Sequence, residues 1–426
     1  MSDSPIATLN HVDRLRKVRE FTRSICDPLQ IEDYVVQSMP DASPTRWHLA
    51  HTTWFFETFL LKPFDSSYKS TNDAFEYLFN SYYNAVGKPY PRAKRGLLTR
   101  PTVKEVWDYR ESVDKSLFDL LAKLDVAENA DLAHVLELGL QHEQQHQELM
   151  LTDIKHVLSC NPLYPAYHNA DTTENATAPD AKWIKYRGGV HPFGFDVEAQ
   201  HGAFHFDNET PVFEHLLQDY QLQDRLVTNA EYLGFINDRG YQRAELWLSM
   251  GWATVEQESW NAPLYWIQDE DGWSEFTLAG KQPLDLSEPV SHVSYFEADA
   301  FARWSGVRLP TEFEWEHAAK SIDTTGNFAD SKHFHPRTAV AANGQPDVAR
   351  QMFGDVWEWT SSQYSAYPGY QPPAGALGEY NGKFMCNQFV LRGGSCATSA
   401  AHIRPTYRNF FPPNARWQFS GIRLAG

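Results

Sequence analysis

DLAHVLELGLQHEQQHQELMLTDIKHVLS, residues 131–159, contains no proline and one glycine, and its apolar residues recur at helical spacing. This pattern predicts one long α-helix. His142 and His146 are four residues apart, so both imidazoles lie on one face of that helix. We expect this face to point toward the core, because the other residues of its stripe are apolar or small: Leu132, Val135, Gly139 and Leu149.

A third histidine, His51, lies in the apolar segment WHLAHTTWFFE, residues 47–57. Neighbouring imidazoles in an apolar setting are costly unless a partner uses their lone pairs, and a divalent transition metal is the usual partner. His51, His142 and His146 are therefore predicted to form one metal site. The spacing alone leaves alternatives open: the three could be ordinary core or surface histidines, and if they bind a metal, zinc fits the spacing as well as other divalent transition metals do.

The N-terminal part of the chain has helical periodicity in four stretches, near residues 10–25, 44–61, 102–125 and 131–159. Ser43-Pro44 is typical of a helix start, with a capping residue followed by proline at the first helical position. Four helices of this length predict an up-and-down bundle. In such a bundle, His51 on the second helix can meet the two histidines of the fourth helix in the interior.

The composition changes after Cys160, and at 426 residues two domains are expected. Residues 161–181 are rich in Pro, Asn, Thr and Ala without periodicity, which is typical of a linker. We therefore predict a helical bundle over 1–162, a linker over 163–182 and a second domain over 183–426. The second domain contains many short strand candidates, with helices expected only near three stretches: 229–238, 294–304 and 311–319.

The formal charge of −18 argues against nucleic acid or an anionic membrane as a partner. No apolar run approaches the length of a membrane span, and the N-terminal residues lack a signal-peptide core. The four cysteines form no CxxC pair, which favours free thiols and a cytoplasmic location. They are Cys26, Cys160, Cys386 and Cys396.

Six C-terminal segments together resemble the sulfatase-modifying, or formylglycine-generating-enzyme-like, domain, a variant of the C-type lectin fold. The segments are FHFDNETPVF (204–213), VTNAEYLGFI (227–236), PVSHVSYFEADAFARWSGVRLPTEFEWEHAA (289–319), FGDVWEWTSS (353–362), VLRGGS (390–395) and FSGIRLA (419–425). The helical half resembles the DinB-like four-helix domain. The resemblance implies an α+β multidomain protein, a DinB-like four-helix bundle followed by a sulfatase-modifying, C-type-lectin-like domain.

The two domains in this order, with three matching histidines, resemble the ergothioneine-biosynthesis sulfoxide synthases (EgtB-like enzymes). This resemblance implies a non-haem Fe(II) enzyme that uses O2 to join the sulfur of cysteine or γ-glutamylcysteine to the imidazole C2 of hercynine. Formylglycine-generating enzymes carry a cysteine pair after the RGGS segment, whereas this chain has only Cys396 there. The conspicuous RLPTEFEWE and GDVWEWT segments are interpreted as structural.

The resemblance also implies roles for substrate-binding residues. Gln145, immediately before the second histidine of the long helix, is expected to bond the hercynine imidazole. Asn409 and Phe410 match the stretch that contacts the trimethylammonium group. Some relatives carry an acidic residue at the position of Phe411, and phenylalanine cannot form the salt bridge that such a residue would make.

The loop between the second and third predicted helices resembles the segment that binds the thiol donor. Arg92 and Arg95 match paired arginines that hold the donor's carboxylate, and a guanidinium fits a carboxylate bidentately. A solvated basic loop is the alternative for both. Tyr82 and Tyr83 resemble active-site tyrosines of relatives that tend toward cysteine, and one of the two is expected to face the iron.

Other functions stay open on the sequence. A selenoneine-type or ovothiol-type synthase would share much of this site, and a DinB-type metal-dependent thiol transferase would use the metal without O2. A binding protein with a lectin-like surface is a further alternative. The sequence does not indicate the oligomeric state.

Overall fold

The computed structural model describes residues 10–169, 176–340 and 348–426. The chain divides into two compact units, each described here by itself. The helical unit comprises Met1–Tyr167 and Ala374–Tyr380, and the mixed unit comprises His168–Pro373 and Asn381–Gly426. A short segment from the C-terminal part of the sequence therefore belongs to the helical unit.

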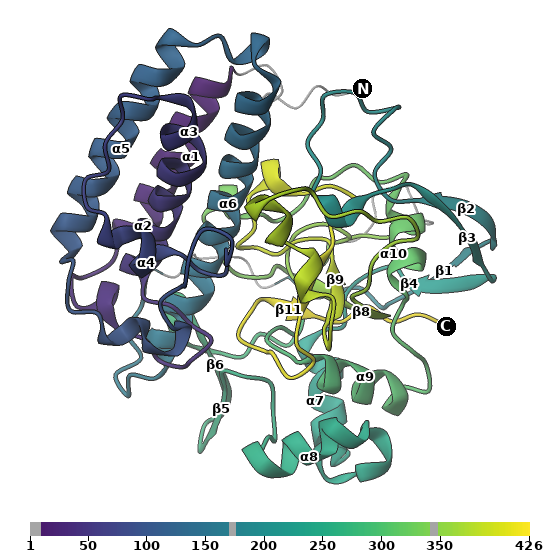
Figure 1. Cartoon of the computed structure of the whole chain (residues 1–426). Helices are drawn as coiled ribbons and strands as arrows, with labels where there is room; N and C mark the ends of the chain where they lie inside the picture. Colours follow the sequence, from purple (N-terminus) through teal and green to yellow (C-terminus); the bar gives the residue numbers. More distant parts are fainter. Residues whose placement is uncertain (1–9, 170–175, 341–347) are drawn as a thin grey trace. The chain divides into compact units, whose positions relative to one another are not determined.

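Four long helices form the helical unit, as the periodicity predicted (Figure 1). They are α1 (His11–Cys26), α2 (Thr45–Phe56), α5 (Val103–Lys123) and α6 (Ala130–Ser159). Helix α6 packs against α1 and α2, and α2 also packs against α5. The shorter elements are η1 (Asp33–Val35), the π-helical turn η2 (Glu57–Leu61), α3 (Lys62–Phe64), α4 (Ala74–Phe79), η3 (Arg92–Leu97), η4 (Val126–Glu128) and η9 (Ala376–Glu379).

Local chemistry explains where most of these helices begin. Thr102 and Glu105 form a reciprocal capping box at α5, and the side chain of Asn129 caps α6. The prediction that Ser43 caps α2 is wrong, because Pro44 occupies the cap position without a side-chain bond. The Ser43 hydroxyl instead accepts a hydrogen bond from Arg95 at 2.9 Å.

A glycine allows α2 and α6 to approach closely. A Cβ atom built on Gly139 would lie 2.6 Å from the Phe56 ring, closer than real contacts allow. A side chain at this position would therefore force the Phe56 ring or one of the two helices to move. The close approach is what brings the histidine of α2 within reach of those on α6.

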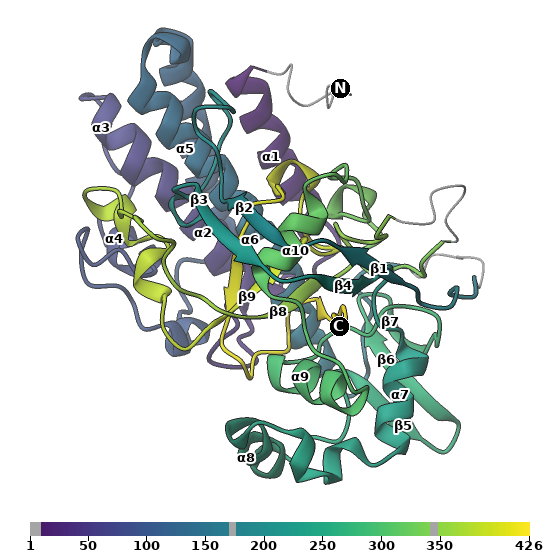
Figure 2. The same ribbon diagram turned by 90° about the vertical axis from the view of Figure 1, so that its right-hand side faces the viewer.

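Short strands and helices build the mixed unit (Figure 2). A four-stranded sheet has the order β10-β9-β8-β11, in which β11 is parallel to β8 and the other pairs are antiparallel. Two antiparallel pairs, β1-β4 and β2-β3, and a three-stranded antiparallel sheet, β5-β6-β7, complete the strands. Their bounds are β1 Trp183–Tyr186, β2 Gly189–Phe193, β3 Phe213–Leu217, β4 Tyr220–Gln223, β5 Trp266–Asp269, β6 Gly272–Thr277, β7 Gly280–Pro283, β8 Trp357–Gln363, β9 Phe389–Arg392, β10 Asn409–Phe411 and β11 Ser420–Gly421.

In the described part of the mixed unit four α-helices accompany these strands, so the expectation of only three was wrong. Helices α7 (Asn229–Asn237), α9 (Tyr295–Trp304) and α10 (Glu312–Ala319) lie where periodicity predicted them, and each begins with a capping box. The additional helix is α8 (Ser249–Glu258). It buries only Gly251 and Val255, so its sequence has no apolar stripe by which to recognise it.

Buried ion pairs and tryptophans hold the mixed unit together. Glu358 on β8 accepts a hydrogen bond from Trp315 Nε1 at 2.9 Å and pairs with Arg423 at 2.7 Å. Glu312 on α10 pairs with Arg408 at 2.8 Å. All five side chains are buried, so the RLPTEFEWE and GDVWEWT segments serve packing and charge neutralisation, as the sequence suggested.

None of the helices in the described ranges combines the length and the hydropathy needed to cross a bilayer. All four cysteines are free thiols.

Candidate metal centre

Helices α2 and α6 bring three buried histidines together. His51 lies on α2, and His142 and His146 lie one turn apart on α6. The Nε2 atoms of His51 and His142 are 3.2 Å apart. One ring nitrogen from each of the three lies within 4.8 Å of the others, close enough to share one ion.

Hydrogen bonds fix which nitrogen of His51 faces this centre. Its Nδ1 donates to the backbone carbonyl of Phe79 at 2.6 Å, because a carbonyl can only accept. The lone pair of the neutral ring is therefore on Nε2, which points toward His142.

A second histidine and a carboxylate orient His146. The Nδ1 atoms of His48 and His146 are 2.8 Å apart, and His48 Nε2 is 3.0 Å from Asp153 Oδ2. His48 donates from Nε2 to the carboxylate, so its Nδ1 accepts from His146 Nδ1. This chain leaves the lone pair of His146 on Nε2, the usual way in which outer residues orient a metal ligand.

Burial keeps all three histidines neutral. Burial, and then the neighbouring His142, hold the pKa of His51 and the pKa of His146 well below the ordinary value. Burial lowers the pKa of His142 to about 3. Without a metal, the short contact between His51 and His142 needs a proton on one of the two Nε2 atoms. A divalent cation at this point would instead receive one lone pair from each of the three histidines. The donor set therefore fits a three-histidine metal site.

Aromatic rings enclose His51 and His142. The ring of Trp47 stacks on His51 at 4.6 Å between centroids, and Trp54 stacks on His51 at 5.5 Å. Phe55 lies 4.5 Å from the ring of His142. These rings cover His51 and His142 and keep water from them on that side.

Other polar residues of the HEQQHQE segment have structural partners. Glu143 is completely buried: its Oε2 pairs with Arg19 at 2.5 Å, and its Oε1 pairs with Arg110 and accepts from the Thr22 hydroxyl at 2.6 Å. Burial alone would raise the pKa of Glu143, but Arg110 and Arg19 lower it. Glu143 thus ties α6 to α1 and α5 behind the metal ligands.

The two predicted arginines lie in different environments. Arg92 is exposed, and its guanidinium donates to the backbone carbonyl of Asp41. Arg95 is 3% exposed, and its guanidinium lies over the ring of Trp47, 3.2 Å from the centroid. Because Trp47 stacks on His51, only Arg95 is linked to the metal centre.

Arg95 has no carboxylate partner among the described residues. Its guanidinium donates to the hydroxyls of Ser43 at 2.9 Å and Ser81 at 3.3 Å, and its Nε has no partner in the described ranges. Burial, and then Arg92, lower the pKa of Arg95 to about 8. A buried cation without a counter-ion is costly, so this position suits an anionic ligand.

The loop after α4 positions Tyr82 and Tyr83. Asn80 holds it by accepting from Tyr83 N at 3.0 Å and donating to the carbonyls of Tyr83 and Gly87. Tyr83 is fully buried, and its ring packs 5.1 Å from that of Phe59. Tyr82 is half-buried and stacks on Tyr83 at 4.7 Å.

Tyr380 is a site residue that the sequence did not predict. It belongs to the segment Ala374–Tyr380 of the helical unit and is 6% exposed. Its ring lies 5.8 Å from that of His142, and its hydroxyl donates to Oε1 of Gln145. The predicted residue Gln145 thus lies on the metal-binding side of α6 with a tyrosine as its partner.

Glu379 anchors this segment to the tyrosine loop. Its carboxylate accepts from the backbone N–H groups of Ala85 at 2.8 Å and Asn84 at 3.1 Å. Tyr82 and Tyr380 therefore lie close together, with ring centroids 6.3 Å apart. Burial, and then the hydroxyls of Tyr82 and Tyr380, raise the pKa of Tyr83 well above its ordinary value.

Asn409 and Phe410 lie on strand β10 of the mixed unit. Both are half-buried, and Asn409 Oδ1 accepts from Phe410 N at 2.9 Å. The ring of Phe410 stacks on Tyr364 at 4.0 Å and lies 5.9 Å from Phe384. Within its own unit this edge of the sheet offers aromatic surface, and its role in substrate binding stays a prediction.

Comparison with known families identifies both parts of the chain. The Sulfatase-modifying factor enzyme 1-like domain family matches residues 169–350 and 348–426. The DinB superfamily matches residues 14–150, which include all three histidines of the metal centre. The expected fold class, a DinB-like bundle followed by a sulfatase-modifying α+β domain, is confirmed.

Curated relatives match nearly the whole chain. A hercynine oxygenase of Mycolicibacterium thermoresistibile is 31% identical over 91% of this chain and 88% of its own length. A hercynine oxygenase of Mycobacterium tuberculosis is 32% identical over 91% of each chain. A formylglycine-generating enzyme of Streptomyces coelicolor is 29% identical but covers 50% of this chain.

Proposed function

The chain belongs to the hercynine oxygenase family of non-haem iron enzymes, and from this premise we propose that it joins cysteine to hercynine. The proposed product carries a new bond between the cysteine sulfur and C2 of the hercynine imidazole, with the sulfur as a sulfoxide. The S–H and C2–H hydrogens leave with one oxygen atom of O2 as water, and the other oxygen atom stays on sulfur. The reaction thus balances without an external reductant.

The observation that carries this proposal is the convergence of His51, His142 and His146 as neutral imidazoles. These three residues would hold Fe(II) and leave positions open for ligands. The iron would supply the chemistry that binds a thiolate and activates O2. The remaining steps concern the side chains around it.

Arg95 is proposed to bind the carboxylate of the thiol donor. The support is its burial, its lack of a carboxylate partner among the described residues, and its stacking on Trp47 beside His51. Cysteine brings one carboxylate to this single buried guanidinium. γ-Glutamylcysteine brings a second carboxylate and an ammonium group, whereas Arg92 is exposed and already donates to Asp41. This difference favours cysteine as the donor.

Gln145 and Tyr380 are proposed to meet the hercynine imidazole and the reacting oxygen. The Gln145 carbonyl accepts from Tyr380, and its amide nitrogen carries N–H donors suited to an imidazole nitrogen. The Tyr380 hydroxyl is proposed to deliver a proton as the sulfoxide forms; the support is that its ring lies near the rings of His142 and Tyr82. Asn409 and Phe410 remain the proposed contacts of the trimethylammonium group, supported by the family resemblance.

An oxygen-consumption assay tests the proposal. The iron-loaded chain is mixed with hercynine and cysteine under anaerobic conditions, and O2 is then added. We expect one O2 consumed for each sulfoxide formed, with the product identified by mass spectrometry. A parallel reaction with γ-glutamylcysteine should give a lower kcat/KM. Coupling without O2 uptake, as in a thiol transferase, or failure to form the carbon–sulfur bond, would contradict the proposal.

A further inference from the structure

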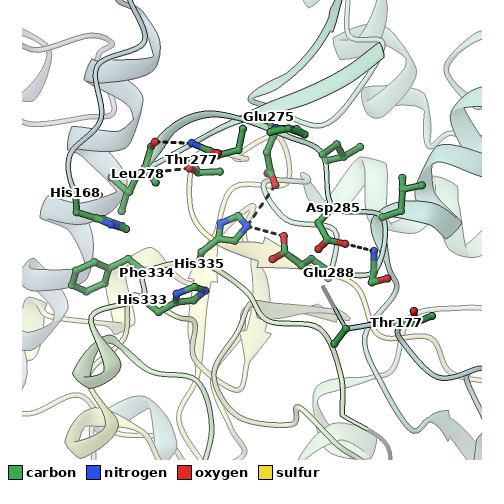
Figure 3. A pocket seen from close by; sticks show the side chains of 17 residues that line it. His168, Thr177, Glu275, Thr277, Leu278, Asp285, Glu288, His333, Phe334 and His335 are labelled. Atoms are coloured by element: carbon green, nitrogen blue, oxygen red, sulfur yellow. Dashed lines mark hydrogen bonds and ion pairs between the residues drawn. The ribbon is translucent and has the colours of Figure 1, made fainter. Parts of the chain in front are cut away.

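A cavity of about 540 Å³ lies within the mixed unit, lined by residues of that unit alone (Figure 3). Glu275 on β6, Glu288 after β7, and His335 after the short helix η8 (Ala329–Ser331) line it. Their side chains point toward one another from three separate segments of the chain. None of them belongs to the histidine site on α2 and α6.

The three side chains converge as metal ligands do. His335 Nε2 is 2.9 Å from Glu288 Oε2 and 3.5 Å from Glu275 Oε1. One ligand atom from each residue lies within 4.8 Å of the others, as in the cluster of His51, His142 and His146. The side chain of Glu275 is 5% exposed, and those of Glu288 and His335 are 15% and 16% exposed.

The charges in the cavity favour a cation. Glu275, Asp285 and Glu288 bring three carboxylates to its wall, and its described lining contains no lysine or arginine. His335 Nδ1 is buried without a hydrogen-bond partner among the described residues, so this ring is not held on its far side. Burial would lower the pKa of His335, but Glu288 and Glu275 raise it to about 10. Without a metal, an imidazolium proton holds the two carboxylates together.

We propose that Glu275, Glu288 and His335 bind a Zn²⁺ ion, which takes the place of that proton. Two carboxylate oxygens and one imidazole nitrogen are ordinary zinc ligands, and three protein ligands leave a fourth position for water. The two carboxylates neutralise the ion, and the cavity offers space for its water. This site goes beyond the proposed sulfoxide chemistry and does not depend on it.

Such an ion would connect parts of the mixed unit that are distant in sequence. Glu275 belongs to the three-stranded sheet, whereas Glu288 precedes Pro289, which bridges to Thr228 at the start of α7. The backbone carbonyl of His335 accepts from Asn327 at 2.7 Å, so the third ligand is fixed to another loop. Zinc should therefore stabilise the unit against unfolding.

Zinc stoichiometry of the full-length chain tests the proposal. Metal-free protein is dialysed against Zn²⁺, and bound zinc is measured by inductively coupled plasma mass spectrometry. The wild type should bind two equivalents, one at each site. E288Q and H335Q should each bind one, and zinc affinity at the second site should fall at least roughly 100-fold, since even residues that only support a ligand contribute 10- to 100-fold. D285N is the matched control, with the same charge change in the same cavity, and should bind two.

The two sites can be separated by combining variants. H142A/H146A should retain one equivalent, and adding E288Q should remove it. Zinc should raise the melting temperature of H142A/H146A but not that of the combined variant, with circular dichroism showing that each is folded. A single equivalent in the wild type, or two equivalents in E288Q, would overturn the proposal and leave His335 as the partner of two carboxylates only.

Discussion

His48 and His146 face each other through their Nδ1 atoms at 2.8 Å, and Asp153 accepts from the other nitrogen of His48 at 3.0 Å. Asp153 also accepts from the backbone N–H of Ser43 at 2.7 Å, just before α2. The orientation of a metal ligand on α6 is therefore coupled to the start of α2.

Replacing His48 should weaken metal binding although His48 is not a ligand. In H48A, His146 loses the acceptor that fixes its tautomer, and Fe(II) affinity should fall by roughly 10- to 100-fold. D153N should have a smaller effect in the same direction, because His48 keeps a hydrogen-bonding neighbour. Anaerobic Fe(II) titration measures both. His134, exposed on the same helix, provides the control H134A, and equal affinities for H48A and H134A would contradict the orienting role.

Removing two ligands should abolish iron binding while the bundle remains folded. H142A/H146A should retain no stoichiometric iron and lose sulfoxide formation. In the wild type, Fe(II) should raise the melting temperature, because it binds only the folded state, and in the variant this increase should vanish. Iron retained at one equivalent in H142A/H146A would contradict the assignment of the centre.

The metal-free protein should lose stability at mildly acidic pH. The pKa values of His51, His142 and His146 are lowered in the folded state, so the unfolded chain binds more protons below pH 6.5. The contribution of these three histidines to the unfolding free energy should thus be constant above about pH 7 and fall below 6.5 by up to about 1.4 kcal/mol per histidine for each pH unit. For His142 this continues toward its folded pKa of about 3. Urea unfolding between pH 7 and 5 measures the slope, which should be shallower in H142A/H146A.

The two arginines should differ in their effect on the thiol donor. R95M should weaken the binding of cysteine by about 1.5–3 kcal/mol, roughly 10- to 150-fold in Kd, because a charged hydrogen bond to its carboxylate is lost. R92M should change the affinity for cysteine little, because Arg92 is exposed. R95M should not lower the melting temperature, since it removes a buried charge without a carboxylate partner in the described part of the chain.

Calorimetric titration of the iron-loaded variants with cysteine, and separately with hercynine, checks this pair. Hercynine affinity should be unchanged in both. Equal losses of cysteine affinity in R92M and R95M, or a parallel loss of hercynine affinity in R95M, would contradict a specific contact between Arg95 and the donor's carboxylate and would indicate a general disturbance of the loop.

Phenylalanine substitutions should distinguish the three tyrosines. Y83F should be nearly silent, because Tyr83 is buried among Trp54, Phe55 and Phe59. Y380F should shift the product from the coupled sulfoxide toward cysteine sulfinate, because the variant loses the hydroxyl proposed as proton donor while its ring stays near His142. Y82F should have an intermediate effect. Chromatography of both products gives the ratio, and an unchanged ratio in Y380F and Y82F would show that the proton comes from another group.

Breaking the buried ion pairs behind the site should lower stability. E143Q leaves Arg19 and Arg110 without their shared carboxylate, and unfolding free energy should fall by roughly 3–5 kcal/mol. E20Q, on the exposed side of α1, is the control and should change it by less than about 0.5 kcal/mol. Chemical denaturation measures both variants.

Helical periodicity predicted the bundle, and the four-residue spacing of His142 and His146 predicted one shared face. The sequence could not show that Glu143 between them is buried by arginines on two other helices, because its partners are more than 30 residues away. Tyr380 escaped prediction for the same reason. It lies 235 residues from Gln145, in a segment without periodicity between strands β8 and β9 of the other unit.

The anchoring of residues 374–380 by Glu379 has a consequence for recombination between homologues. A chimaera that exchanges residues 1–167 as a cassette would inherit the histidines from one parent and Tyr380 from the other. The tyrosine loop and its acidic anchor would then descend from different ancestors, and mismatched pairs would be selected against. Crossovers that preserve activity should therefore transfer both segments together, although more than 200 residues separate them along the chain.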